Sequence, residues 1–499
     1  MFPNDFESEF TFENAAVPLP DEPPFHVLIP GDWSGYSERT ALDDRQSIEI
    51  DRDNFDDVLK KLNVGIELDL YGDENTAIHL RFEELDDFHP DNLFRKVSLF
   101  SDLRDVRYRL SDPNTFNSAA QEVRSWFVST DDNSVTDSEI QTQVDDAPPL
   151  ESNNILDLIL EQPNVSSSSV KPHVTDNSEL GRLVSNLISP YLIKIDENEQ
   201  SKLLSTVDLA ISELMRAILH HPKFLALESA WRGLYFLVRR VETDKDLKIF
   251  ILDFSHHELT VNLKNINNLT DSFLYRRLID RAYSIVGGNY SFGLNVEDVA
   301  SLIRLSKIAY DFDAKFISYI KPEIFGIESF FEVQDVSQLD VFEASNEYKL
   351  WQALRNVSES DHLGLSPMRF LGRLPYGDMT DSIDTFSFEE FNGDVNFERF
   401  VWLNPCFGIA LLLAQSYKIA GSKMKGNLHH DIDNLPVYIY RQNGETKTLP
   451  CAEILLTENL LEKILDQGLI TLISFKDYNR IRLGRFQSVS STKSELGGG

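Results

Sequence analysis

The chain has 499 residues and a formal net charge of −34, from 81 acidic and 47 basic side chains. Nucleic-acid affinity rests on lysine and arginine neutralising phosphates, so this charge argues against a nucleic-acid partner. The apolar runs are shorter than the roughly 18–20 residues that span a bilayer, which argues against membrane insertion. The acidic start, MFPNDFESEF, is not that of a signal peptide.

The composition fits a chain with substantial cores, because 42% of the residues are hydrophobic and the length suits about three domains. Cys406 and Cys451 are the two cysteines, too few for a disulfide framework or a zinc site. We therefore expect a reducing compartment. Solubility is the simplest reason for the acidity. A second interpretation is a charged outer face that limits aggregation of a densely self-associating protein.

Residues 1–24 are acidic and contain five prolines, and we expect them to form an extended arm. From residue 25 to 115 strand-like and helix-like segments alternate, which indicates a first α/β domain. The expected strands are 25–29, a short strand from 48, 65–70 and 77–82, and the expected helices are 55–62 and 90–110. The motif GDWSG at 31–35 has serine in its fourth place, so it is not a G-x-S-x-G nucleophile elbow.

Residues 116–177 are polar and acidic, and their composition predicts a flexible linker. Inside it, the apolar run ILDLIL predicts a short helix at 153–161. An isolated helix of this length is marginal in water, so it must fold against a partner or against its own chain. The residues that would make the contact are Ile155, Leu156, Leu158, Ile159 and Leu160.

Two amphipathic helices are expected at 201–218 and 224–238, because apolar residues recur there every three or four positions. Pro222 separates them, and we expect a helix hairpin that docks on the edge of a sheet. The next expected elements are a strand 247–254, a helix 273–285, a turn at Gly287-Gly288, helices 296–310, 348–357 and 406–420, and a strand 316–320. These elements predict a second domain over 178–488 and a loose tail over 489–499. The predicted fold class is α/β, with two mixed α/β domains joined by a disordered linker and extended terminal arms.

Several polar groups resemble chemical sites, and each has a simpler explanation. An acidic cluster at 83–89, with Asp86, Asp87 and His89, suits the start of a helix, whose dipole favours carboxylates. Neighbouring histidines on a strand point to opposite faces, so His429 and His430 chelate poorly. The pairs at 220–221 and 256–257 have the same explanation. We therefore predict no catalytic residues, no cofactor site and no metal site.

The stretch HHPKFLALESAWRGLYFLV, with Trp231, Arg232 and Gly233, resembles the signature of the large subunit of the type VI secretion contractile sheath, TssC/VipB. A second phrase, around an L-P-Y-G turn, and a third, W-x-N-P, resemble the same family. Their arginines are either interface anchors or members of internal ion pairs. These family-signature residues are Arg369, Arg373, Pro375, Tyr376, Gly377, Trp402, Asn404 and Pro405.

The first domain resembles the sheath small subunit, TssB/VipA, through GDWSG, IEIDRDNFDDVLKKL and the phrase around residues 85–90. Together the resemblances cover 25–115 and 178–488. They imply a small-subunit-like and a large-subunit-like half fused in one chain, although the family usually has them as separate proteins. The large subunit of the family usually continues beyond the segment that matches Phe486.

The resemblance implies a structural protomer, not an enzyme, that polymerises around an inner tube and contracts to propel it. Its implied partners are further copies of itself, the inner-tube protein Hcp, baseplate components and the disassembly ATPase ClpV, all in the bacterial cytoplasm. In the family ClpV captures a short helix, a role that would fall on the apolar residues between 155 and 160. Candidate exchanged arms are 8–20 and 480–490. The alternatives are an α/β enzyme and a soluble adaptor or assembly-interaction module without catalysis.

Overall fold

The computed structural model describes residues 24–35, 39–70, 77–128, 199–333, 335–393, 395–421, 424, 428–442, 444–492 and 496. The predicted N-terminal arm up to residue 23, the predicted linker beyond residue 128 and its short helix at 153–161 lie outside these residues. We call 24–128 the N-terminal half and 199–496 the C-terminal half.

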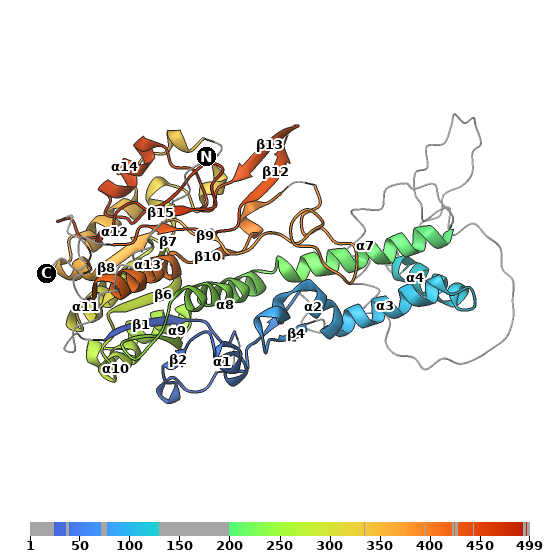
Figure 1. Ribbon diagram of the computed structural model, residues 1–499, viewed down its shortest axis with the longest axis horizontal. Coiled ribbons are helices and arrows are strands. Elements are labelled where there is room, and N and C mark those ends of the chain that lie inside the picture. Colours follow the sequence, from blue (N-terminus) through green and yellow to red (C-terminus); the bar gives the residue numbers. More distant parts are fainter. Residues whose placement is uncertain are drawn as a thin grey trace, which may run out of the picture.

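A six-stranded sheet lies toward one end of the long axis of the molecule and takes strands from both halves (Figure 1). Its strands, in spatial order, are β2 (Ile48–Ile50), β5 (Leu247–Asp253), β1 (Phe25–Gly31), β6 (Ile285–Phe292), β7 (Lys315–Ile320) and β8 (Leu363–Ser366). β1 pairs in parallel with β5 on one side and with β6 on the other, and β2 is the one antiparallel strand of this sheet. The two halves therefore share one sheet.

The sequence of β1, FHVLIPG, explains its central place. All seven residues are buried, as expected for a strand covered on both faces and paired on both edges. Phe25 lies opposite Leu247, and the register continues to Gly31 opposite Asp253. Without the C-terminal half, both edges and both faces of this apolar strand would meet water.

Helices pack on the sheet and bury it. α13 (Pro405–Ala420) contacts β1, β6 and β7, and α8 (Pro222–Arg240) packs on α13. α13 is apolar on nearly all sides, which suits a helix inside the core. The other helices around the sheet are α9 (His256–Asn265), α10 (Phe273–Ile279), α11 (Val296–Asp311) and α12 (Asn346–Arg355).

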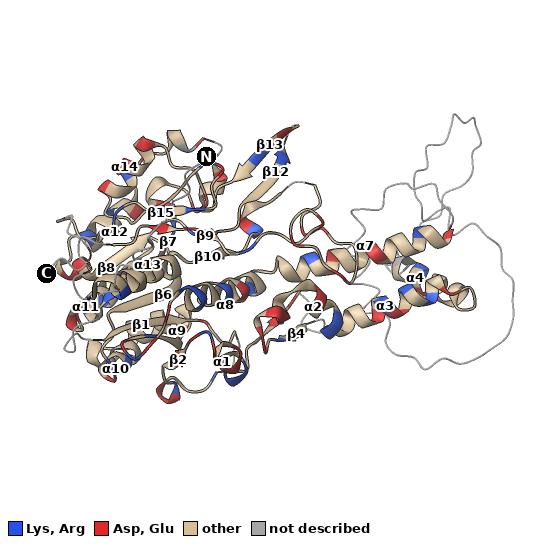
Figure 2. Ribbon diagram, viewed as in Figure 1, with Lys and Arg blue, Asp and Glu red and all other residues tan. Residues whose placement is uncertain are grey.

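Three helices extend away from the sheet as an arm-like bundle: α3 (Ser98–Ser111), α4 (Phe116–Val128) and α7 (Glu199–Leu219) (Figure 1). α3 packs on both α4 and α7 through buried apolar residues that include Leu103, Val123 and Val207. Both signs of charge lie along these helices (Figure 2), and Arg107 pairs with Asp208 across the two halves at 2.5 Å. The linker prediction is wrong at its start. The segment from Phe116 onwards forms α4, and the apolar side chains that recur between Phe116 and Trp126 pack on α3.

Smaller elements complete the two halves. The N-terminal half adds α1 (Phe55–Leu62), α2 (Pro90–Lys96) and the strand pair β3 (Gly65–Leu68) and β4 (Ile78–Arg81). The C-terminal half adds the pairs β9 (Phe370–Leu371) with β10 (Trp402–Leu403) and β12 (Tyr438–Gln442) with β13 (Glu445–Leu449). It also has α14 (Glu458–Asp466) and a three-stranded sheet of β11 (Asp431–Ile432), β15 (Ile481–Leu483) and β14 (Leu472–Ser474).

Two further predictions, the helix hairpin and the turn at Gly287-Gly288, are wrong. α7 and α8 follow one another along the long axis and form no hairpin (Figure 1), because α7 packs on α3 while α8 packs on α13. Gly287 and Gly288 lie inside β6, not in a turn. A Cβ at Gly287 would lie 2.7 Å from Cδ1 of Ile29, so glycine permits the close approach of β1.

The end of the chain is also packed where the structure describes it. The N–H of Val489 donates to the carbonyl of Leu363 at 2.9 Å, and Leu496 is 6% exposed. The expectation of a loose tail is therefore wrong for these positions. β15 pairs with β11 and β14 of its own chain, and exchange of residues 480–490 between copies stays a prediction. The predicted mixed α/β class is confirmed.

Candidate functional site at the seam between the halves

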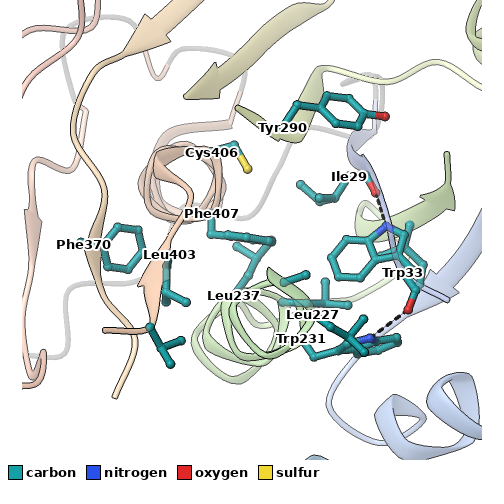
Figure 3. Close-up of a cluster of buried hydrophobic side chains, with 14 of the residues drawn as sticks. Ile29, Trp33, Leu227, Trp231, Leu237, Tyr290, Phe370, Leu403, Cys406 and Phe407 are labelled. Atoms are coloured by element: carbon teal, nitrogen blue, oxygen red, sulfur yellow. Dashed lines mark hydrogen bonds between the residues drawn. The ribbon is translucent and has the colours of Figure 1, made fainter. Parts of the chain in front are cut away.

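The two halves meet through two tryptophans (Figure 3). Trp33 follows β1 and Trp231 lies on α8, and both are fully buried. The indole N–H of Trp33 donates to the carbonyl of Ile29 at 3.0 Å, and that of Trp231 donates to the carbonyl of Trp33 at 3.0 Å. The rings meet edge to face with centroids 5.4 Å apart. Trp231 therefore fixes α8 to the end of β1.

The next signature residues set the spacing of helices. A Cβ at Gly233 would overlap the ring of Phe407, so glycine lets α8 approach α13 closely. Asn404 caps α13, since its side chain accepts the N–H of Cys406 at 3.0 Å, and its amide donates to the carbonyl of Tyr290 at 2.7 Å. Pro405 takes the first position of α13, where a missing N–H has no cost.

A buried charge network joins α8 to the segment after β9. Arg373 donates to Glu228 at 2.7 Å and to Glu390 at 2.7 Å, and Arg232 donates to Glu228 at 2.7 Å and to the Tyr376 hydroxyl at 3.0 Å. Burial acts to raise the pKa of Glu390, but the charge of Arg373 and the contact with His220 lower it to about 2. These arginines are internal partners of carboxylates, which balances charges that would be costly to bury alone.

The same segment is held by the N-terminal half. The Asp91 carboxylate accepts the N–H of Asp384 at 3.1 Å and both the N–H and the hydroxyl of Thr385, at 3.0 and 2.6 Å. The ring of Tyr376 meets that of His89 with centroids 4.9 Å apart. Gly377 leaves room for Glu389, which a Cβ there would overlap, and the carbonyl of Pro375 accepts the Thr380 hydroxyl at 2.5 Å. Residues 373–391 therefore tie α8 to α2 across the seam.

A second charge cluster crosses the seam near the end of β1. Arg45 donates to Glu258 at 2.8 Å, and Arg39 lies 3.1 Å from the same carboxylate. The Asp253 carboxylate accepts the N–H of Trp33 at 2.9 Å and the Ser34 hydroxyl at 2.8 Å. Burial would raise the pKa of Glu258, but its hydrogen bonds from Arg45 and Ser255 and the charge of Arg39 lower it to about 2. The cluster thus matches basic groups of the N-terminal half to acidic groups of the C-terminal half.

The two remaining signature residues also have partners inside the chain. Arg369 pairs with the buried carboxylate of Glu453, donating to it at 2.5 Å, and lies over the ring of Tyr319. The indole N–H of Trp402 donates to the carbonyl of Phe397 at 2.8 Å. The backbone carbonyl of Trp402 accepts the Ser229 hydroxyl at 2.5 Å. Every signature residue therefore contributes to packing or to an internal pair.

Next to the seam lies a groove of about 1320 Å³. It opens beyond the carboxyl ends of β1 and β5, with residues of β6 and β7 and the start of α9 in its walls, and the segment 396–404 forms another wall. His256 lies in it 3.3 Å from Asp298. Burial acts to raise the pKa of Asp298, but the contact with His256 and the N–H of Gly293 lower it.

The groups weighed as metal sites have other partners. Asp87 is 1% exposed, accepts the N–H of Glu83 at 2.8 Å and pairs with Lys96. His221 caps α8, and Asp431 pairs with Arg482 at 2.7 Å. Among the described residues, no three side chains of His, Cys, Asp or Glu are grouped to hold a metal ion. In the same part of the chain, no helix has the length and apolar character to cross a membrane.

Sequence reasoning found Trp231 and the arginines but missed most of their acidic partners. Glu228 was visible through its four-residue spacing from Arg232. Glu390, Glu453 and Asp91 carry no local signal, because their partners lie far away along the chain. The residues proposed to bind a partner, 155–160, lie outside the described structure.

The fold and the seam are those of a packed two-part structural module. Residues 201–493, more than half of the chain, match the family model of VipB, described as EvpB/VC_A0108, tail sheath N-terminal domain. Residues 13–128 match the model described as type VI secretion system, VipA, VC_A0107 or Hcp2. The chain therefore belongs to the VipB tail sheath family and carries a VipA domain in the same polypeptide.

Two curated relatives from Pseudomonas aeruginosa agree with this division. The type VI secretion system sheath protein TssC1 is 30% identical over 306 residues, which cover 58% of this chain and 61% of the relative. The type VI secretion system sheath protein TssB1 is 32% identical over 99 residues, which cover 19% of this chain and 58% of the relative. The chain thus spans about three fifths of the length of each relative.

Proposed function

We propose that the chain is a structural protomer of a type VI secretion sheath, which polymerises around an inner tube and contracts to propel it. The observation that carries this proposal is the match of both sheath families to one chain, together with a sheet to which both matched regions contribute. A sheath transmits force through its protomers, so each protomer must move as a unit. The shared sheet and the buried pairs across the seam supply that rigidity.

The proposed partners follow from the family. They are further copies of the chain, the inner-tube protein Hcp, baseplate components and the disassembly ATPase ClpV, in the bacterial cytoplasm. ClpV would capture the apolar run at residues 155–160. Deleting residues 153–163 should abolish ClpV binding in a pull-down while leaving the melting temperature unchanged. Unchanged ClpV binding would refute this assignment.

The sheath proposal is tested by assembly of the purified full chain. We expect ultracentrifugation to pellet it and negative-stain electron microscopy to show hollow tubes, either alone or after addition of the inner-tube protein. Small particles in both conditions would contradict the proposal and favour a soluble adaptor. Contraction is tested by comparing the diameter and length of tubes assembled with and without the inner tube, and a single unchanging diameter would contradict it.

A further inference from the structure

A histidine lies in the central strand, at a place where the two halves meet. His26 belongs to β1, is 8% exposed and pairs in register with Lys248 of β5. Its Nδ1 atom lies 2.9 Å from the carbonyl oxygen of Ala282, so the neutral ring donates its one N–H there. Its ring also meets the rings of Phe250 and Tyr283 edge to face, with centroids 5.6 and 6.4 Å apart. One imidazole of the N-terminal half thus contacts two segments of the C-terminal half.

Two cations flank this ring, and the carboxylates of the same elements already have partners. Lys248 lies on the same face of the sheet as His26. The Arg281 guanidinium lies 4.2 Å from the centre of the Phe250 ring, on which the His26 ring also packs. The other polar groups are paired: Glu49 with Lys248 at 2.9 Å, Asp280 with Arg277 at 3.3 Å, and the Tyr283 hydroxyl with that of Ser47 at 3.0 Å. Within the described residues His26 has no ion pair, so a second proton on its ring would add charge beside two cations without gaining a partner.

We propose that His26 is an acid-sensitive switch of the seam, which holds β1 in the shared sheet while its ring is neutral and loosens β1 when the ring is protonated. A charge without a partner is costly at a site that is 8% exposed, and opening the sheet there returns the ring to water. The loosening should be local, because His26 lies at the start of β1. Trp33 and the cluster of Arg39 and Arg45 lie beyond the other end of this strand.

The direction of the effect follows from the pKa of His26. Burial lowers this pKa from its ordinary value of 6.5, and the charges of Arg281 and Lys248 lower it further, against the opposing hydrogen bond to Ala282. Below about pH 6.5 the unfolded chain therefore binds a proton that the folded chain does not, and stability falls as the pH drops through this range. The loss expected for Glu258 and Glu390 begins only below about pH 4.5, so the two effects occur at different pH.

The test is urea unfolding of the full chain at pH 7.5, 6.5 and 5.5, followed by tryptophan fluorescence. We expect the urea midpoint of the unmodified chain to fall between pH 7.5 and pH 5.5. His26→Gln keeps a side-chain N–H for the Ala282 carbonyl but does not titrate, so its midpoint should fall by about half as much or less. Arg281→Gln removes a neighbouring cation and should also make the fall smaller, because protonated His26 is then less unfavourable.

The matched controls are His79→Gln, at an exposed histidine of β4, and Lys264→Gln, whose side chain is 69% exposed. Both should show the same fall as the unmodified chain. Equal falls in the unmodified chain and in His26→Gln would overturn the proposal.

A second measurement needs no variant. Hydrogen exchange of the unmodified full chain, corrected for the intrinsic effect of pH, should show peptides from 25–31 and 247–253 losing protection between pH 7.5 and pH 5.5. Peptides from α8 should keep theirs. Unchanged protection in β1 and β5 would contradict the switch. Neither measurement requires tubes, so the outcome is independent of the sheath proposal.

Discussion

Arg373 is the residue on which the buried charge network depends. It bonds both Glu228 and Glu390, which are 0% and 1% exposed. Arg373→Ala leaves two buried carboxylates without their shared partner, and we expect it to lower the free energy of unfolding by about 3–5 kcal/mol in urea denaturation. Arg52→Ala removes an arginine from an exposed pair and should change stability by no more than about 0.5 kcal/mol. A loss below about 1 kcal/mol for Arg373→Ala would contradict the role of the network.

The carboxylates Glu258 and Glu390 predict how stability depends on pH. Their pKa values are about 2 in the folded chain, below the ordinary value of about 4.5 for an unfolded glutamate. Their contribution is therefore complete above about pH 4.5 and is lost as the pH falls towards 2, because the unfolded chain binds protons that the folded chain does not. Chemical denaturation at pH 5, 4 and 3 should show stability falling at each step.

Two substitutions separate these residues from the general effect of acid. In Glu258→Gln and Glu390→Gln the fall in stability between pH 5 and pH 3 should be smaller than in the unmodified chain, because one carboxylate no longer titrates. Asp53→Asn, at a side chain that is 88% exposed, serves as the control and should leave the fall unchanged. An equal fall in stability between pH 5 and pH 3 in all four proteins would show that Glu258 and Glu390 do not govern the response to acid.

Gly233 tests the close approach of α8 and α13. Gly233→Ala should lower the free energy of unfolding by about 1–3 kcal/mol, because its methyl group overlaps the Phe407 ring. In the Gly233→Ala background, Phe407→Leu should lower the free energy of unfolding by less than it does in the unmodified chain. A double-mutant cycle measures this coupling. Strictly additive effects would mean that the two residues do not meet.

At the residue scale, sequence reasoning succeeded where a residue type was unusual in its setting. The W-R-G phrase singled out Trp231, Arg232 and Gly233, and each has a distinct contact. It failed for Glu390 and Asp91, which look like ordinary acidic residues. Their importance comes from partners more than a dozen residues away, and no local spacing reports such contacts.

Among the elements, α4 is the clearest departure from expectation. Its sequence is polar enough to suggest a linker, yet Ala119, Ala120, Val123 and Trp126 recur on one face and are at most 2% exposed. Long-range packing on α3 decides the structure of this segment. The prediction of a turn at Gly287-Gly288 failed for a related reason. Two glycines suggest a turn, but here they lie in the central strand β6 and leave space for neighbouring side chains.

Trp126 tests whether α4 belongs to the folded arm. Trp126→Ala should lower the free energy of unfolding by about 3–5 kcal/mol, because a fully buried indole is removed. Gln121→Ala, on the exposed side of the same helix, should have an effect within about 0.5 kcal/mol. The measurement is thermal or urea unfolding of the full chain. Equally small losses of stability in the two variants would mean that residues 116–128 belong to the linker and not to the folded arm.

In the whole molecule, the family phrases identified both sheath families in one chain, but they could not show how the halves combine. The strand β1 reads as an ordinary apolar run, and nothing in its sequence indicates that its neighbours are β5 and β6, more than 200 residues later. The sheet, Trp33 with Trp231, and the Arg39 and Arg45 cluster all cross the seam. The two halves therefore form one interleaved unit, held by contacts and not by the covalent connection.

Cutting the connection between the halves shows whether the contacts alone hold them together. A specific protease site inserted between residues 150 and 170 of the full chain allows complete cleavage, followed by gel filtration and native mass spectrometry. We expect the two fragments to stay together as a one-to-one complex and to separate only in denaturant, because β1 remains paired on both edges. Fragments that elute apart under native conditions would contradict it.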